Sequence, residues 1–277
     1  DALRLLATHV IERHYPEAKN CKNWYSELLK LVVKRQAELI SKWQAVGFIH
    51  GVMNTDNTSV AGETIDYGPC AFMDNFNSQK VFSSIDQMGR YSYSNQPAIA
   101  QWNLTCFAET LLPLINKKEA EALQEAADLI NQFPSIYKKF YLKAIRRKLG
   151  LKRELTQDIQ LIKDLFNCMQ DNEADFTLTF RSLCGINSNN ELNDGHIRKL
   201  FKNPKEFDLW GKKWRERISF ESANDQERKL DMKLVNPKFI PRNHRIEEVI
   251  NDAVNEGDFS LFNEFLEVLI EPYSEHE

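Results

Sequence analysis

The sequence has few of the residues that interrupt helices. Its 277 residues include only 10 glycines and 9 prolines, whereas leucine, isoleucine, lysine, glutamate and glutamine are frequent. Glycine and proline are the residues least compatible with a helix interior, and long unbranched side chains are among the most compatible. The composition therefore predicts a mainly α-helical protein of one large domain or two smaller ones.

Further deficits exclude whole classes of protein. The five cysteines are odd in number and form no C-x-x-C pair, which argues against a disulfide framework or a zinc site and favours reduced thiols. No apolar run approaches the length of a membrane span. The formal net charge of −4 gives no electrostatic case for nucleic-acid binding. We therefore expect neither a membrane nor a nucleic acid as partner.

Apolar residues recur at helical spacing along most of the chain. The first fifty residues predict two helices separated near Pro16, Pro97 is well placed to begin another, and the end of the chain predicts a helix–turn–helix around Gly257. Further helices are predicted over about 117–132, 135–149, 155–170, 174–184 and 207–219.

One predicted helix carries a cluster of six cations. Its members are Lys138, Lys139, Lys143, Arg146, Arg147 and Lys148. We interpret the cluster as a solvated helix face, because charge runs on helices usually face water, and we keep binding of an anionic partner as the alternative.

The helical period fails between residues 50 and 96, where Gly, Asn, Asp, Ser and Pro accumulate. Val60 and Ile65 flank Gly62, which predicts a small β-hairpin over about residues 58–66. Long irregular segments inside compact domains are usually functional, so we expect the chemistry of the protein to lie here.

This segment contains an ordered set of residues that matches the protein-kinase pattern H-R-D-x-x-x-x-N followed by D-x-G. His50 falls on the kinase histidine, Asn57 on the metal-binding asparagine, and Asp66 with Gly68 on the D-x-G motif. An amide oxygen and a carboxylate from neighbouring segments are suitable ligands for the magnesium ion of a nucleotide. The pattern therefore predicts a kinase-type metal site.

One position departs from the kinase pattern. Val52 occupies the place of the catalytic base, and valine cannot accept a proton, so Asp56 is the nearest replacement carboxylate. Spacing alone leaves an equal alternative, in which Asp56 and Asn57 serve only as turn residues and Asp66 caps a turn.

Longer stretches resemble the selenoprotein O family of pseudokinase-like proteins over nearly the whole chain. They read HGVMNTDNTSVAGETIDYGPCAFMD, GRYSYSNQPAIAQWNL and NPKFIPRNHRIEEVI. The resemblance implies a kinase-like fold that moves AMP from ATP, bound in a flipped orientation, onto Ser, Thr or Tyr hydroxyls of proteins. It implies Asp56 as the proton acceptor, Asn57 and Asp66 as ligands of Mg²⁺ (or Mn²⁺), and Asp66 as the contact to the ATP phosphates. It also implies a cytoplasmic location in a bacterium and a mitochondrial one in a eukaryote.

The resemblance divides the chain into a kinase-like C-lobe segment over residues 1–115, with the catalytic and metal-binding loops, and a C-terminal helical extension over 116–277. No glycine-rich phosphate loop or lysine-bearing strand precedes His50. We therefore expect a C-terminal half that lacks the N-terminal lobe and is inactive alone. Two alternatives stay open: a kinase-like phosphotransferase and a non-catalytic helical interaction module.

Overall fold

The computed structural model describes residues 1–191 and 194–276 and is mainly helical, as predicted. Its contacts divide the chain into two compact units. Unit 1 comprises Asp1–Gln44, His50–Cys70 and Val81–Tyr141, and unit 2 comprises Ala45–Ile49, Ala71–Lys80 and Leu142–Glu277. The functional division predicted between residues 115 and 116 falls inside unit 1 and stays a prediction, as do the kinase-like C-lobe and the absent N-terminal lobe.

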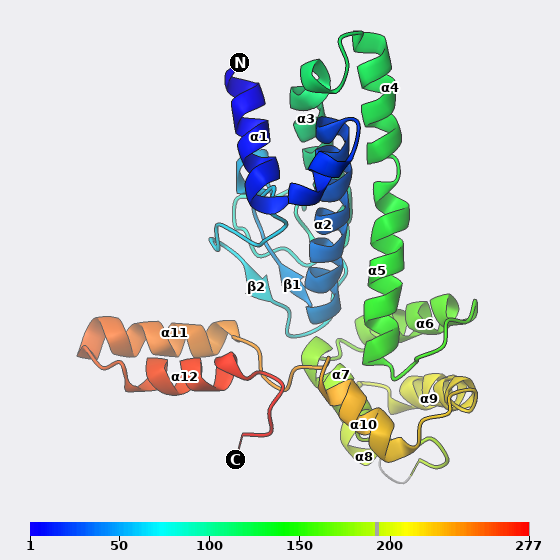
Figure 1. The fold of residues 1–277 in the computed structure, drawn as a ribbon. Helices are drawn as coiled ribbons and strands as arrows, with labels where there is room; N and C mark the ends of the chain where they lie inside the picture. Colours follow the sequence, from blue (N-terminus) through cyan, green and yellow to red (C-terminus); the bar gives the residue numbers. More distant parts are fainter. Residues whose placement is uncertain (192–193, 277) are drawn as a thin grey trace. The chain divides into compact units, whose positions relative to one another are not determined.

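Unit 1 is built on four helices and the first part of a fifth (Figure 1). Its elements are α1 (Ala2–His14), η1 (Pro16–Asn20), α2 (Trp24–Val46), η2 (Thr55–Asn57), η3 (Tyr93–Asn95), α3 (Gln96–Ile115), α4 (Glu119–Ile130) and α5 (Phe133–Lys148). The apolar stripes of α1, α2 and α3 are buried, which confirms the helices predicted from their spacing; they include Ile11, Leu28, Val32, Ile40, Leu104 and Leu111.

Unit 2 consists mainly of short helices around an aromatic core. Its elements are α6 (Asp158–Asp171), α7 (Phe176–Leu183), α8 (Gly195–Arg198), α9 (Pro204–Ile218), α10 (Asp225–Lys233), α11 (Asn243–Asn251), the π-helical turn η4 (Asp252–Glu256) and α12 (Ser260–Ile270). Helix α6 packs against α9. Phe76, Phe166 and Phe176 pack with centroids 5.0–6.2 Å apart, and this clustering of large apolar surfaces supplies much of the core.

The only strands in the described residues are two residues long. Strands β1 (Phe48–Ile49) and β2 (Ala71–Phe72) pair antiparallel, with Phe48 opposite Phe72. The small sheet is therefore confirmed, but the predicted hairpin over residues 58–66 is wrong. Backbone carbonyls there accept side-chain hydrogen bonds instead: Ser59 from Gln36 and Val60 from Tyr15. These two carbonyls therefore have hydrogen-bond partners without pairing to a neighbouring strand.

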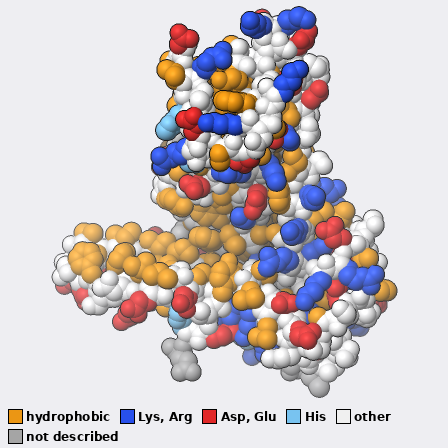
Figure 2. Space-filling model, viewed as in Figure 1, with side chains coloured by type: hydrophobic (Ala, Val, Ile, Leu, Met, Phe, Trp, Pro, Cys, Tyr) orange, Lys and Arg blue, Asp and Glu red, His pale blue; other side chains and the backbone are white. Residues whose placement is uncertain are grey.

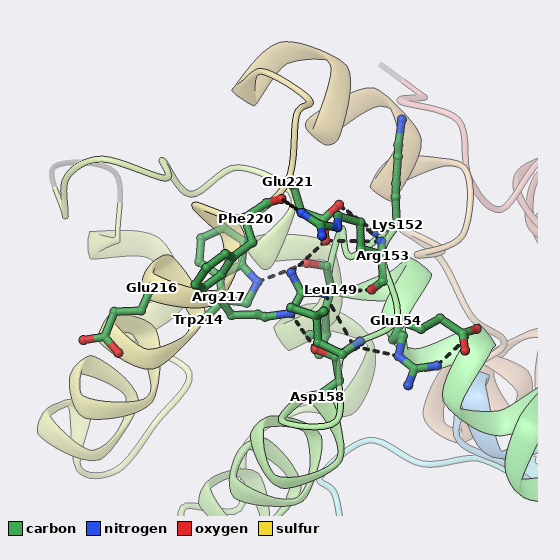
Figure 3. Close-up of polar contacts among 12 residues, drawn as sticks. Leu149, Lys152, Arg153, Glu154, Asp158, Trp214, Glu216, Arg217, Phe220 and Glu221 are labelled. Atoms are coloured by element: carbon green, nitrogen blue, oxygen red, sulfur yellow. Dashed lines mark hydrogen bonds and ion pairs between the residues drawn. The ribbon is translucent and has the colours of Figure 1, made fainter.

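A buried ion-pair network links α6 to the end of α9 (Figure 3). The Asp158 side chain is fully buried and accepts hydrogen bonds from Arg217 Nε at 2.5 Å, Arg146 Nε at 2.8 Å and the Leu155 backbone nitrogen at 3.0 Å. Burial disfavours the carboxylate, but the bonds from Arg217, Leu155 and Arg146 outweigh it and lower the pKa of Asp158. Arg217 also binds Glu221, at 2.7 Å.

The cation cluster on α5 is not a uniformly solvated face, so that interpretation is wrong for part of it. Arg146 and Lys148 are buried, with exposed fractions of 8% and 2%. Arg146 reaches Asp158, whereas the Lys148 ammonium lies 4.4 Å from the ring centre of Phe180. Lys138 and Lys139 are exposed, as predicted. The last turns of α5 belong to the core of unit 2, which sequence spacing does not reveal.

The hairpin of α11 and α12 exposes a band of hydrophobic side chains, which Figure 2 shows along both helices. The exposed members include Ile250, Val254, Phe259, Phe262, Leu266 and Ile270. No residue of α12 is buried. In the described part of the chain, no helix combines the length and apolar character needed to cross a membrane.

Candidate functional site

Residues 50–66 form an irregular segment that polar side chains from the helices of unit 1 hold in place. Asn103 of α3 donates from Nδ2 to the Met53 carbonyl at 3.1 Å and to Thr58 Oγ1 at 2.9 Å. Gln36 of α2 donates to the Ser59 carbonyl at 2.6 Å. Each bond satisfies a polar group that has no strand partner, so the segment has a defined conformation without regular structure.

His50 ties the two ends of this segment together. Its backbone nitrogen donates to Gln96 Oε1 at 3.0 Å, and its ring nitrogen Nε2 donates to the Ile65 carbonyl at 2.8 Å. The ring is 1% exposed and stacks on Trp43, with centroids 5.4 Å apart. The bond to Ile65 fixes the backbone directly before Asp66, which gives His50 an orienting role.

Asn57 is held by its amide nitrogen. Nδ2 donates to the Val52 carbonyl at 3.0 Å, and the Asn57 backbone nitrogen donates to the Asn54 carbonyl at 3.1 Å within η2. The bond to Val52 leaves the amide oxygen Oδ1 as the ligand atom that a hard cation prefers. Val52, which cannot act as a base, contributes its backbone to the site in this way.

Asp66 has a backbone conformation that is uncommon for its residue type. Its φ is +54°, in the left-handed region, and its carbonyl accepts a hydrogen bond from the Gly68 nitrogen at 2.9 Å. The Asp66 side chain is exposed. A non-glycine residue pays a conformational cost in this region, and such residues cluster at functional sites. The conformation belongs to the tight turn of the D-x-G motif.

Asp56 lies in the middle of η2, one residue before Asn57, and is exposed to solvent. The structure therefore places the three sequence-predicted residues in one restrained segment of unit 1, with Asp56 and Asn57 adjacent and Asp66 positioned through His50. Convergence of the Asn57 and Asp66 oxygens on one metal ion stays a prediction.

Sequence reasoning missed the residues that hold the site. Asn103, Gln96 and Gln36 are polar residues on otherwise apolar helix faces, and all three are buried or nearly so. A buried polar residue needs a partner, so each signals a nearby chain segment with unsatisfied backbone groups. That signal was available in the sequence, but the partner segment was not identifiable from it.

The candidate metal-ligating side chains of this segment suit a metal ion whose coordination sphere is completed by other ligands, such as water or substrate phosphates. No group of three His, Cys, Asp or Glu side chains within residues 1–191 and 194–276 is arranged to hold a metal ion alone. Mg²⁺ is usually bound by one or two protein oxygens together with waters and substrate phosphates. An amide oxygen from Asn57 and an exposed carboxylate from Asp66 fit that requirement.

Comparison with known proteins defines the class to which this helical chain belongs. A family model described as "Protein adenylyltransferase SelO" matches residues 1–270. The chain therefore belongs to this family, which confirms the resemblance seen in the motifs.

The curated relatives carry the name protein nucleotidyltransferase YdiU. The chain is 52% identical to the protein from Bradyrhizobium diazoefficiens, 50% to that from Nitrobacter hamburgensis and 48% to that from Rhizobium meliloti. Each comparison covers 99% of this chain but only 56%, 54% and 56% of the respective relative. The chain thus spans about half the length of the curated relatives it matches.

Proposed function

We propose that this chain carries the catalytic loop and metal ligands of a protein adenylyltransferase that transfers AMP from ATP to protein hydroxyls. The single observation that carries the proposal is the restrained segment 50–66. In it the Asn57 amide is oriented by its hydrogen bond to the Val52 carbonyl, and Asp66 is exposed in a turn with left-handed backbone conformation. Family membership supports the nucleotidyl-transfer chemistry.

Asp56 is the proposed proton acceptor. The substrate hydroxyl oxygen forms a bond to the α-phosphorus of ATP, and the bond from that phosphorus to the oxygen bridging the β-phosphate breaks. Pyrophosphate leaves, and Asp56 takes the hydroxyl proton. Asn57 and Asp66 would hold Mg²⁺, and the ion would neutralise phosphate charge. Asp56 is exposed and adjacent to Asn57, which leaves its carboxylate accessible to a substrate hydroxyl.

The position of a radioactive label separates this reaction from phosphoryl transfer. Full-length enzyme is incubated with protein substrate and ATP labelled either at the α- or at the γ-phosphorus. Adenylyl transfer leaves the α label on protein and releases the γ label. Retention of the γ label alone would establish the phosphotransferase alternative, and retention of neither would favour the interaction module.

Charge-neutral variants assign the roles of the two carboxylates. Asp56→Asn is expected to lower turnover by about 100-fold or more while ATP–Mg²⁺ binding persists, because only proton transfer is lost. Asp66→Asn is expected to weaken both, because it removes a metal ligand. Glu63→Gln is the matched control, since Glu63 is exposed in the same segment and carries no role in the proposal. Near-normal turnover in Asp56→Asn would reduce Asp56 to a turn residue.

We further propose that the 277 residues alone are catalytically silent. Triphosphate binding needs cationic side chains and backbone donors facing the phosphates, and the two metal ligands alone hold Mg²⁺ weakly. Calorimetric titration of ATP–Mg²⁺ into this chain is expected to give no micromolar affinity. Micromolar binding that Asp66→Ala abolishes would place the whole nucleotide site within these residues.

A further inference from the structure

A cavity of about 360 Å³ opens in unit 2 where the C-terminal turns of α5 meet α10. Its volume lies in the range of small-molecule sites. Ten residues from α5, the loop that follows it, α10 and the position directly after α10 line the cavity: Lys143, Arg146, Arg147, Gly150, Leu151, Lys152, Glu154, Arg228, Asp231 and Leu234. None of them belongs to the segment that holds Asp56, Asn57 and Asp66.

The lining is strongly cationic. Five of the ten residues are Lys or Arg, and only Glu154 and Asp231 carry the opposite charge. Lys152 pairs with Asp231 at 2.6 Å, and Glu154 lies 3.4 Å from Arg146. Both carboxylates of the lining are therefore already engaged by cations of the lining, and a positive excess remains.

Two buried arginines give this cavity fixed walls. Arg146 is anchored by Asp158, and Arg228 is 3% exposed, pairs with Asp225 at 2.6 Å and stacks over Trp214. Arginines held by carboxylates and an aromatic ring keep their guanidinium groups in place, so this part of the wall is preorganised, while its charge is balanced by Asp158 and Asp225.

Gly150 allows the second arginine to approach. Its φ is +74°, and a Cβ at this position would lie 2.6 Å from Arg228 Cγ and 2.7 Å from Cδ. Any other residue would be strained in this backbone conformation and would also push Arg228 away. The chain is thus shaped to bring a cation of α10 against the end of α5.

Lys143 and Arg147 supply the available charge. They are exposed and lie one turn apart on the same face of α5, and their side chains make no hydrogen bond or ion pair with any residue that the structure describes. Like charges four residues apart on a helix repel one another and disfavour it. The helix dipole accounts for cations in the last turn of α5, but Lys143 lies a turn earlier.

We propose that this cavity binds a phosphate-bearing small anion. Arg147 offers a planar fork that suits two phosphate oxygens, and Lys143 offers a mobile point charge beside it. Leu151 and Leu234 provide an apolar wall next to these cations, which suits a ligand that joins a phosphate to an apolar part. A mononucleotide and inorganic pyrophosphate are the two probes that separate an organic ligand from a free anion.

The test is calorimetric titration of AMP and of inorganic pyrophosphate into the chain at low ionic strength. We expect saturable binding that weakens at least tenfold in Lys143→Ala/Arg147→Ala. Lys138→Ala/Lys139→Ala is the control, because it removes the same charge from exposed positions of the same helix outside the cavity. Tighter binding of AMP than of pyrophosphate would identify an organic ligand, and the reverse an inorganic one.

A second variant tests the cavity without removing a cation. Leu234 is exposed at the cavity wall, so Leu234→Glu keeps the fold, places a carboxylate beside the ligand and is expected to weaken binding. Thermal melting of each variant verifies folding. Equal weakening by both double variants would show a diffuse electrostatic effect, and absence of saturable binding to either probe would mean that the cavity is no anion site; either result overturns the proposal.

Discussion

Replacing the buried Lys148 by methionine is expected to stabilise the protein. The ammonium group contacts the faces of Phe176 and Phe180, at 5.9 and 4.4 Å from the ring centres, and no carboxylate among the described residues pairs with it. Burial is the main influence on this group and lowers the pKa of Lys148 to about 7, against a small opposing effect of the Cys184 thiol. Methionine keeps much of the length and volume of the side chain and carries no charge.

The size of the effect follows from the shift. The pKa of Lys148 falls from its ordinary 10.5 to about 7. At about 1.4 kcal/mol per pKa unit, the free-energy cost of burying the charged lysine is at most about 5 kcal/mol. The variant also loses the cation–π contacts with Phe176 and Phe180, which reduces its advantage by about 1–2 kcal/mol. The Lys148→Met variant is therefore expected to be more stable by about 3–4 kcal/mol at pH 7.

The sign of the pH dependence is fixed by proton linkage. Between pH 7 and 10.5 the unfolded chain binds the Lys148 proton and the folded chain does not, so this residue makes stability rise with pH across that window. The buried Cys168 acts in the opposite direction, because burial raises its pKa to about 12 and only the unfolded thiol ionises at mildly alkaline pH. The difference between variant and parent cancels the thiol and isolates the lysine.

Urea unfolding at a series of pH values, followed by circular dichroism, measures this difference. The advantage of Lys148→Met should be full below pH 7 and shrink by about 1.4 kcal/mol per pH unit between about pH 7 and 10.5. Lys138→Met is the control on the exposed part of the same helix. A gain that is independent of pH, or a loss of stability at pH 7, would refute the account of a desolvated lysine.

Two substitutions test other features of the fold. Asp158→Ala should cost about 3–5 kcal/mol in urea unfolding, because it removes the buried carboxylate that two buried guanidinium groups share and leaves each with one remaining carboxylate; a cost below about 1 kcal/mol would contradict this. Gly62→Ala should destabilise more than Gly257→Ala, although both have positive φ, because only the Cβ at position 62 would lie 2.7 Å from Arg35 Cβ. Equal melting temperatures of the two variants would remove the steric argument.

Helices were predictable from the sequence because their signal is local. The stripes that define α2 and α3 recur every three to four residues, and the helix ends near Pro16 and Pro97 follow from proline chemistry. Strands β1 and β2 are two residues each, too short for an alternating pattern to emerge. The hairpin expected around Gly62 failed because side chains distant in sequence satisfied its backbone.

The candidate site was predictable as a set of residues but not as an arrangement. His50, Asn57 and Asp66 follow from motif spacing, whereas the bonds that position them come from Val52, Ile65 and helix α3. The burial of Arg146 and Lys148 was likewise hidden, because it depends on long-range packing that gives one cation a carboxylate and the other only aromatic rings.

The apolar band on the α11–α12 hairpin affects the heat capacity of the protein. Side chains such as Val254 and Ile270, which are 75% and 69% exposed when folded, gain little further hydration on unfolding. The unfolding heat capacity should accordingly fall below the usual value of about 12–15 cal/mol/K per residue, and the curve of stability against temperature should be flatter. A molecule that covers the band would bury this apolar surface, so its association with the protein should have a negative heat-capacity change.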